Sequence, residues 1–204
     1  MSVAGLLLAA GAGTRFGGPK ALVAWDGELL VHRAARVLRE GGCDPVVLVV
    51  GAQADRVREA AGLPDVVLSP DWSTGMGASL RAGLAGLPAG TDACVVALVD
   101  QPLVGSAAVA RLRAAWADGA VAAVATYAGR PRNPVLLDRS VWGEVAALAE
   151  GDAGARAWLR AHPDRTTAVP CDDTGSPDDV DTPADLAALP VRVPQSLPRR
   201  VLTA

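Results

Sequence analysis

One pattern recurs along most of the chain: a short, continuous apolar run is followed by an amphipathic stretch. The apolar runs predict strands at Ala4–Ala9, Pro45–Val50, Val66–Leu68, Ala93–Val99 and Val121–Tyr127. The stretches between them predict helices at Leu30–Glu40, Ala54–Ala61, Gly77–Leu87 and Ala107–Asp118. Because the runs are apolar throughout rather than alternating, the strands should be covered on both faces. The pattern therefore predicts a single three-layer α/β domain with a mostly parallel, Rossmann-like sheet and right-handed crossovers.

The rhythm becomes less regular after Tyr127. Short strands are expected at Val135–Leu137 and Arg165–Val169, and helices at Val141–Ala149, Ala155–Arg160 and Pro183–Leu189. We expect the domain to span residues 1–189. The tail, residues 190–204, contains Pro190, Pro194 and Pro198, which prevent a helix. It should be extended or disordered, or pack on a neighbouring subunit.

Composition excludes several classes of protein. A chain of 204 residues, half of them apolar, can bury a core large enough to fold without disulfides or metals. Charged residues make up 20% and the formal net charge is −3, so no strong field favours nucleic acid or a membrane surface as a partner. No run approaches the roughly 18 apolar residues of a membrane-spanning helix.

The cysteines and the N-terminus favour a cytoplasmic protein. Cys43, Cys94 and Cys171 are odd in number, widely spaced and form no Cys-x-x-Cys pair, which excludes a disulfide framework and a thiolate zinc site. The apolar run Val3–Ala10 has no basic segment before it and leads straight into glycines. We therefore interpret it as a buried first strand rather than a signal peptide.

A glycine-rich loop follows this first strand, with the sequence Gly11-Ala12-Gly13-Thr14-Arg15-Phe16-Gly17-Gly18-Pro19-Lys20. Glycines let backbone N–H groups approach a polyphosphate closely, and Arg15 and Lys20 add positive charge. Lys20 is the only lysine beside eighteen arginines. Either it survives by chance, or its position requires a compact ammonium group.

Two common phosphate-binding motifs do not fit this loop. In a dinucleotide fingerprint the third glycine would fall on Phe16, and the acid expected after the second strand is replaced by Gly51-Ala52-Gln53. A Walker A loop needs Gly-Lys-Ser/Thr, whereas Gly18 is followed by Pro19.

The loop instead resembles the signature of the molybdenum-cofactor nucleotidyltransferases, the MobA-like NTP transferases. The resemblance extends over about Val3–Leu186 and looks closest to the molybdenum cofactor cytidylyltransferases. In that family Leu-Ala-Ala-Gly accompanies cytidine and Leu-Ala-Gly-Gly accompanies guanosine, so Ala10 implies CTP. The resemblance implies nucleotide contacts at Leu8, Ala9, Ala10, Gly11, Gly13 and Lys20.

A second segment, Ser73–Leu80, resembles the family's other nucleotide-binding stretch. It implies contacts at Ser73, Gly75, Met76, Gly77 and Ser79. The free N–H groups of a first helical turn suit a phosphate. A plain capped helix start, with Ser73 or Thr74 as the N-cap, explains the same residues, and both interpretations can hold together.

Two acidic positions resemble the family's metal site. Asp100 follows a predicted strand, and the carboxyl ends of parallel strands are where ligands bind. Asp178-Asp179-Val180-Asp181-Thr182-Pro183 resembles the family's C-terminal Asp-x-Asp-Thr-Pro segment. Asp179 and Asp181 would point the same way in an extended segment, and we favour Asp181. Asp100 and Asp181 are thus expected to hold Mg²⁺, although Asp100 could instead cap a helix.

The acceptor side is less well matched. Gly151-Asp152-Ala153-Gly154-Ala155-Arg156 resembles an acceptor segment of the family, although it could be a solvated loop. Where the cytidylyltransferases carry Gly-His-Pro, this chain has Gly129-Arg130-Pro131-Arg132-Asn133-Pro134. Arg130, Arg132 and Asn133, with Asp152, are candidates for the acceptor side. The two arginines could bind an anionic acceptor or be solvated. His32 and His162 are not expected to be catalytic.

The resemblance implies that the phosphate of molybdopterin attacks the α-phosphate of CTP and releases pyrophosphate. Arg15, Lys20 and Asp100 would be the catalytic residues, acting by alignment and charge neutralisation. Two alternatives remain open: an NAD(P)H-dependent reductase similar to the nicotine-blue oxidoreductases, and a non-catalytic nucleotide-binding partner of a molybdoenzyme.

Overall fold

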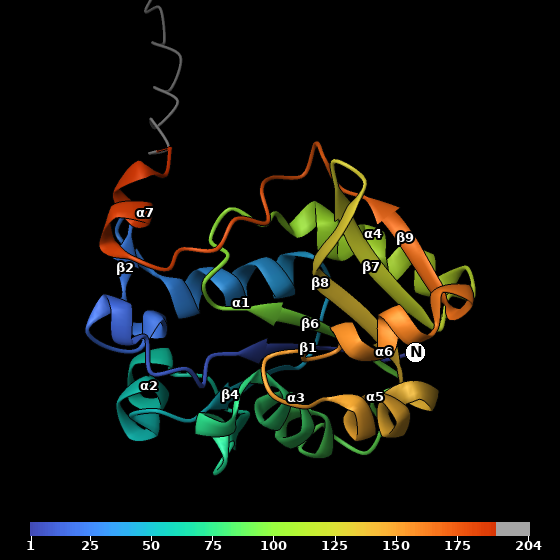
Figure 1. Cartoon of the computed structure of the whole chain (residues 1–204), viewed down its shortest axis with the longest axis horizontal. Helices are drawn as coiled ribbons and strands as arrows, with labels where there is room; N and C mark the ends of the chain where they lie inside the picture. Colours follow the sequence, from blue (N-terminus) through green and yellow to red (C-terminus); the bar gives the residue numbers. More distant parts are fainter. Residues whose placement is uncertain (191–204) are drawn as a thin grey trace, which may run out of the picture.

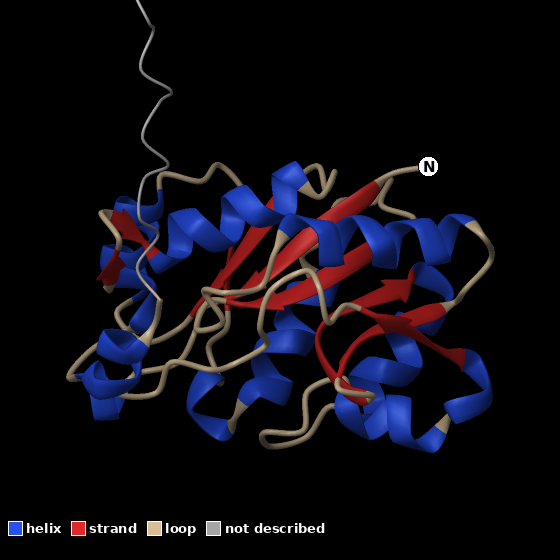
Figure 2. Ribbon diagram, turned by 90° about the horizontal axis from the view of Figure 1, so that it is seen from above, coloured by secondary structure: helices blue, strands red, loops and turns tan. Residues whose placement is uncertain are grey.

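The computed structural model describes residues 1–190, which form a seven-stranded sheet with helices on both faces (Figures 1 and 2). The strands of this sheet are β1 (Val3–Leu8), β4 (Val46–Val50), β5 (Val66–Leu68), β6 (Ala93–Leu98), β7 (Ala122–Tyr127), β8 (Arg130–Asp138) and β9 (Thr166–Pro170). A separate hairpin joins β2 (Ala24–Trp25) to β3 (Glu28–Leu29).

The α-helices are α1 (Leu30–Glu40), α2 (Ala54–Ala61), α3 (Met76–Ala85), α4 (Ser106–Ala117), α5 (Trp142–Leu148), α6 (Arg156–Ala161) and α7 (Pro183–Ala188). Short 3₁₀ helices are η1 (Thr14–Phe16), η2 (Lys20–Leu22), η3 (Trp72–Thr74), η4 (Arg139–Val141) and η5 (Pro163–Arg165). The helices α1 and α2 have the predicted bounds, and the other predicted helices lie within two residues of their predicted positions. The predicted tail lies outside the described residues from position 191 onward.

The sheet order is β5-β4-β1-β6-β8-β7-β9, and it is mostly parallel as predicted. The strand β1 lies between β4 and β6 and runs parallel to both. The strands β4 and β5 are parallel, as are β7 and β9. Only β8 runs against its two neighbours, β6 and β7.

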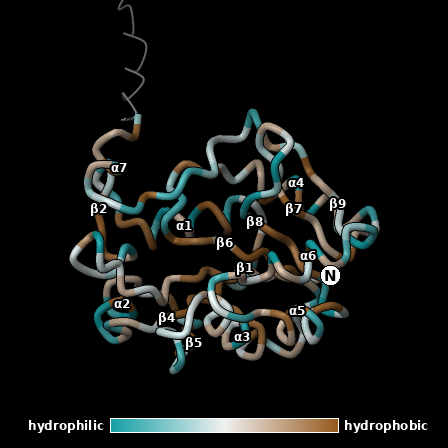
Figure 3. Tube along the Cα trace, in the orientation of Figure 1, coloured by the Kyte–Doolittle hydropathy of each residue, from teal (hydrophilic) through white to brown (hydrophobic). Residues whose placement is uncertain are grey.

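Alternate residues of the central strand supply two separate cores. Val3 and Leu7 of β1 pack with α1 and α4 on one face. Leu6 and Leu8 pack with α3, α5 and α6 on the other. Figure 3 shows the apolar strands enclosed between more polar outer segments. Burial on both faces explains why β1, β4 and β7 are apolar runs, since neither side of the pleat meets water in these strands.

The strand β8 differs from its prediction. The sequence predicts only Val135–Leu137, but β8 begins at Arg130. Ala128 and Gly129 both have positive φ, at 49° and 70°, and turn the chain back tightly so that Arg130 pairs with Tyr127. The segment 130–132 is therefore the start of an antiparallel strand rather than a loop.

Two further expectations from the sequence concerned the cysteines and membrane-spanning helices. Cys43, Cys94 and Cys171 are all free and buried. Within the described part of the chain, no helix combines the length and the hydropathy that crossing a membrane requires.

Candidate active site

The site lies at the carboxyl ends of β1 and β6, which run side by side in the centre of the sheet. Leu8 and Leu98, the last residues of the two strands, are directly paired. The glycine-rich loop leaves β1 at this point, and Asp100 follows β6 two residues after Leu98. Parallel pairing thus brings the predicted phosphate loop and the predicted metal acid together.

The glycine-rich loop is closed by its own backbone. The N–H groups of Phe16 and Gly18 both donate to the carbonyl of Gly13, at 2.8 and 3.2 Å. Gly13 has φ of 58°, and a Cβ there would lie 2.0 Å from the Gly18 oxygen. Any side chain at position 13 would therefore break the loop. The chain then enters η2 at Lys20, which fixes where the lysine side chain begins.

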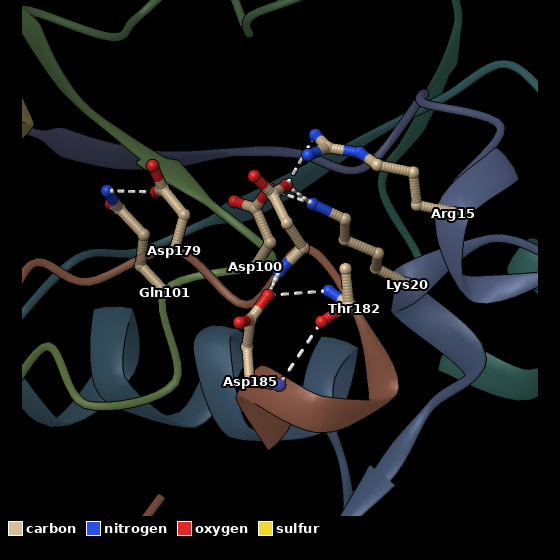
Figure 4. A network of polar contacts seen from close by, with 8 residues as sticks. Arg15, Lys20, Asp100, Gln101, Asp179, Thr182 and Asp185 are labelled. Carbon is tan, nitrogen blue, oxygen red and sulfur yellow. Dashed lines mark hydrogen bonds and ion pairs between the residues drawn. The ribbon is translucent and has the colours of Figure 1, made fainter. Parts of the chain in front are cut away.

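Lys20 joins the two predicted metal-binding acids. Its Nζ donates to Oδ2 of Asp100 at 2.9 Å and to Oδ1 of Asp181 at 2.6 Å. Nη2 of Arg15 also contacts Oδ1 of Asp181, at 3.0 Å. Figure 4 shows the two basic side chains reaching the carboxylates from the same side. Four residues from three distant segments thus form one charged cluster.

Asp181 is held by the backbone around it. The N–H of Val180 donates to the carbonyl of Asp100 at 2.8 Å, which fastens this segment to the end of β6. Thr182 and Asp185 form a capping box at the start of α7, and the N–H of Asp181 donates to Oδ2 of Asp185 at 3.0 Å. The Thr182-Pro183 pair therefore serves as a helix start, as the sequence suggests, and also positions Asp181.

Asp179 faces a different partner. Its Oδ1 accepts a hydrogen bond from Nε2 of Gln101 at 2.8 Å. Gln101 is buried and also donates to the carbonyl of Pro177, at 3.0 Å. Asp181, rather than Asp179, is thus the acid of this segment that meets Lys20 and Arg15.

The hydrogen bonds of the cluster favour the charged forms of Lys20 and Asp181. Burial alone would lower the pKa of Lys20, but its hydrogen bonds to Asp100 and Asp181 outweigh burial and raise the pKa. The hydrogen bond from Lys20 holds the pKa of Asp181 below its ordinary value. The lysine is therefore an ammonium and Asp181 a carboxylate at neutral pH.

A cavity of about 470 Å³ opens beside the cluster. Its walls contain most of the predicted nucleotide-binding residues and both basic residues of the loop: Leu8, Ala9, Ala10, Gly11, Gly13, Arg15, Lys20, Ser73, Gly75, Met76 and Ser79. Trp72 also lines the cavity and was missed by the sequence analysis. Its place, just after β5 and directly before the Ser73 segment, is the signal that could have found it, because ligands gather at the carboxyl ends of strands.

A second cavity, of about 440 Å³, adjoins the first. Leu8, Met76, Leu98, Asp100 and Asp181 line both. The second cavity has an aliphatic floor from the sheet and from α3. Its polar lining residues include Arg132, Asn133, Gln101, Arg156, Asp178 and Asp179.

Three predicted residues take other places. Asp152, expected on the acceptor side, lines the first cavity. Arg130, at the start of β8, is exposed and lines neither of the two cavities. Gly77 also lines neither, because it is buried under the loop after α5 and its N–H donates to the carbonyl of Gly151 at 2.8 Å. Its amide therefore has a protein partner already.

The described residues do not form a complete metal cage. Among residues 1–190 there is no group of three or more His, Cys, Asp or Glu side chains able to hold a metal. Asp100 and Asp181 are two carboxylates that both face the ammonium group of Lys20. Two carboxylates fit a Mg²⁺ or Mn²⁺ ion that would complete its coordination with water and substrate phosphates.

Comparison with known proteins identifies the family. A model of the MobA-like NTP transferase domain matches residues 5–166. The chain belongs to this family. The match includes the glycine-rich loop and Asp100, and ends before Asp181.

Individual proteins similar to this chain differ in the activities that their names give. The chain is 41% identical to the nicotine blue oxidoreductase of Paenarthrobacter nicotinovorans, over 88% of this chain and 92% of that protein. It is 35% identical to the molybdenum cofactor guanylyltransferase of Burkholderia vietnamiensis, over 79% of this chain and 83% of that protein. A crystal structure of Rv0371c of Mycobacterium tuberculosis in complex with manganese superposes with a TM-score of 0.73 and 32% identity, covering 93% and 100% of the two chains.

Proposed function

We propose that this MobA-like protein transfers a nucleotidyl group from a nucleoside triphosphate to a phosphorylated acceptor, with release of pyrophosphate. One observation carries this proposal: Asp100 and Asp181 line both cavities. A triphosphate in the first cavity and an acceptor in the second would meet at these two carboxylates. Family membership and the guanylyltransferase relative support the same reaction class.

The chemistry needs alignment more than covalent help. An oxygen of the acceptor phosphate attacks the α-phosphorus of the nucleotide, a new P–O bond forms, and the bond to the β-phosphate oxygen breaks. The backbone of the Gly11–Gly18 loop would hold the phosphates, and Arg15 and Lys20 would offset the charge of the leaving pyrophosphate. Asp100 and Asp181 would hold Mg²⁺, which when bound neutralises charge at the reacting phosphates. The manganese complex of Rv0371c supports the binding of a divalent cation by a protein of this fold.

The donor we propose is CTP, and the acceptor is molybdopterin. Ala10 is 5% exposed and lines the first cavity, so its methyl group takes space that glycine would leave to a larger base. The molybdenum-cofactor relative named above is a guanylyltransferase, which makes GTP the direct competitor. For the acceptor, the second cavity offers an apolar floor for a ring system and Arg132 and Arg156 for an anionic group. We further propose that the product is delivered to a molybdoenzyme and that the protein acts in the cytoplasm.

The test is pyrophosphate release with CTP, GTP, ATP or UTP, each with Mg²⁺ or Mn²⁺ and molybdopterin. We expect release with CTP and metal, and its loss in Asp100→Asn while circular dichroism shows an intact fold. Release only with GTP would correct the donor. Full activity of Asp100→Asn would remove Asp100 from the reaction.

A second candidate function rests on the nicotine blue oxidoreductase relative, at 41% identity over most of both chains. That relationship supports reduction of a quinone-type pigment by NAD(P)H on the same fold. Oxidation of NADPH that needs no divalent cation, together with no pyrophosphate release from any triphosphate, would establish it in place of nucleotidyl transfer.

A further inference from the structure

The ammonium group of Lys20 is the most enclosed member of the charged cluster. Its side chain is 15% exposed, against 23% for Asp100 and 36% for Asp181. Arg15, the other cation of the cluster, is 66% exposed and contacts only Asp181. Lys20 thus occupies the space between the two carboxylates, whereas Arg15 lies at the edge.

The same carboxylates are the ones that a divalent cation would use. An ammonium within hydrogen-bond distance of both carboxylates already neutralises much of their charge, and it would repel a dication placed beside it. We propose that Lys20 is the resident cation of the metal site. In the nucleotide-free protein it pairs with both Asp100 and Asp181 and opposes metal binding, and it releases them when a triphosphate enters. This inference rests on the proposed function of the site.

The position of Lys20 allows such an exchange. Lys20 lines the first cavity together with the glycine-rich loop, so phosphates bound by that loop would lie within reach of its side chain. An ammonium has three N–H donors, and two of them go to the carboxylates. A polyphosphate offers a denser negative charge than the two carboxylates and would draw the ammonium toward it.

The two carboxylates are anchored independently of Lys20. The backbone bond from Val180 to Asp100 fastens the two segments together, and the capping box of Thr182 and Asp185 fixes the turn that carries Asp181. The carboxylates should therefore stay together when the lysine leaves. It follows that nucleotide and divalent cation bind cooperatively, each weakly without the other.

Mn²⁺ binding in the absence of nucleotide tests the proposal directly. The paramagnetic resonance signal of free aqueous Mn²⁺ gives the affinity of the wild type and of Lys20→Met. We expect Lys20→Met to bind Mn²⁺ about tenfold more tightly, because the competing charge is gone. Adding Asp100→Asn to Lys20→Met should remove that gain. The control Arg15→Met deletes an exposed cation from the same Asp181 and should change the affinity by about twofold or less.

A second measurement uses the wild-type chain. Because Lys20 is the only lysine, protein labelled with ¹³C-lysine gives a single side-chain Cε signal. We expect this signal to shift when inorganic tripolyphosphate is added with Mg²⁺, and to stay in place with Mg²⁺ alone. This experiment remains decisive even if Lys20→Met does not fold.

The results of these experiments distinguish the proposed role of Lys20 from the proposed nucleotidyl transfer. Equal Mn²⁺ affinity in the wild type and Lys20→Met, or a lysine signal that tripolyphosphate with Mg²⁺ leaves unmoved, overturns the role of Lys20 while leaving nucleotidyl transfer possible. No Mn²⁺ binding in any variant, with or without tripolyphosphate, overturns the metal site and with it the metal-dependent part of the proposed function.

Discussion

Gly77 in α3 and Gly143 in α5 offer a matched test of how the loop after α5 is held against the first cavity. Both are helical glycines without positive φ. A Cβ at Gly143 would have nothing within 4 Å. A Cβ at Gly77 would lie 2.4 Å from the oxygen and 2.6 Å from the carbonyl carbon of Ala149. The added methyl group of alanine therefore meets no atom at position 143, whereas at position 77 it collides with the backbone of Ala149.

The expected effects have opposite signs. Alanine is a better helix former than glycine by about 0.8–1 kcal/mol, so Gly143→Ala should stabilise the protein by up to that amount. At Gly77, overpacking costs about 1–3 kcal/mol. Weakening the 2.8 Å bond from the Gly77 N–H to the Gly151 carbonyl costs roughly 1 kcal/mol more. After the helix gain is subtracted, Gly77→Ala should lose about 2 kcal/mol of unfolding free energy. For a domain of this size that lowers Tm by roughly 4–8 °C.

The substitution should also reach the site. The displaced loop carries Asp152, which lines the first cavity, and Gly154, which lies against Met76 of the same cavity wall. Nucleotide affinity should therefore fall in Gly77→Ala and stay unchanged in Gly143→Ala. Urea denaturation gives the stability, and isothermal calorimetry with CTP and GTP gives the affinity. If Gly77→Ala proves as stable as Gly143→Ala and binds nucleotide like the wild type, the loop is not held by this contact and the reasoning fails.

Three further changes have defined outcomes. Ala10→Gly should raise the ratio of kcat/KM for GTP over CTP, because the cavity wall loses a methyl group; a pyrophosphate-release assay that finds the ratio unchanged would separate Ala10 from base choice. The pKa of Glu28 lies below its ordinary value of 4.5 because Arg36 donates hydrogen bonds to both carboxylate oxygens. This pair therefore stabilises the fold above pH 4.5, and the stabilisation is lost as the pH falls through the lowered pKa. Glu28→Gln should therefore be less stable than the wild type at pH 7, and the difference should shrink under acid in urea titrations; a difference that is constant with pH would contradict this. Thr182→Ala removes the capping box before α7 and should cost about 1 kcal/mol in thermal unfolding, with weaker Mn²⁺–nucleotide binding because Asp181 loses its support; unchanged binding would show that the cap and the site are independent.

Local sequence was sufficient to predict the strands and helices of the parallel half of the sheet. The strands β1 and β4 and most of β6 are apolar runs because both of their faces are buried. Local chemistry also predicted a tight glycine-rich loop after β1, since only glycine allows the backbone closure seen at Gly13. These features depend on neighbours in sequence, so the sequence determines them.

The antiparallel strand and the shared cluster needed the tertiary structure. The prolines near Arg130 argue against a strand, but the tight turn at Ala128–Gly129 and the open partner β7 override that local preference. Asp100 lies 80 positions after Lys20 along the chain, and Asp181 lies 161 positions after it. Their contact with Lys20 depends on how the fold brings β6 and the segment before α7 together. A motif can name such residues, but the distance between two side chains is set by packing. That packing places an ammonium between the two acids, and no pattern along the chain contains this fact.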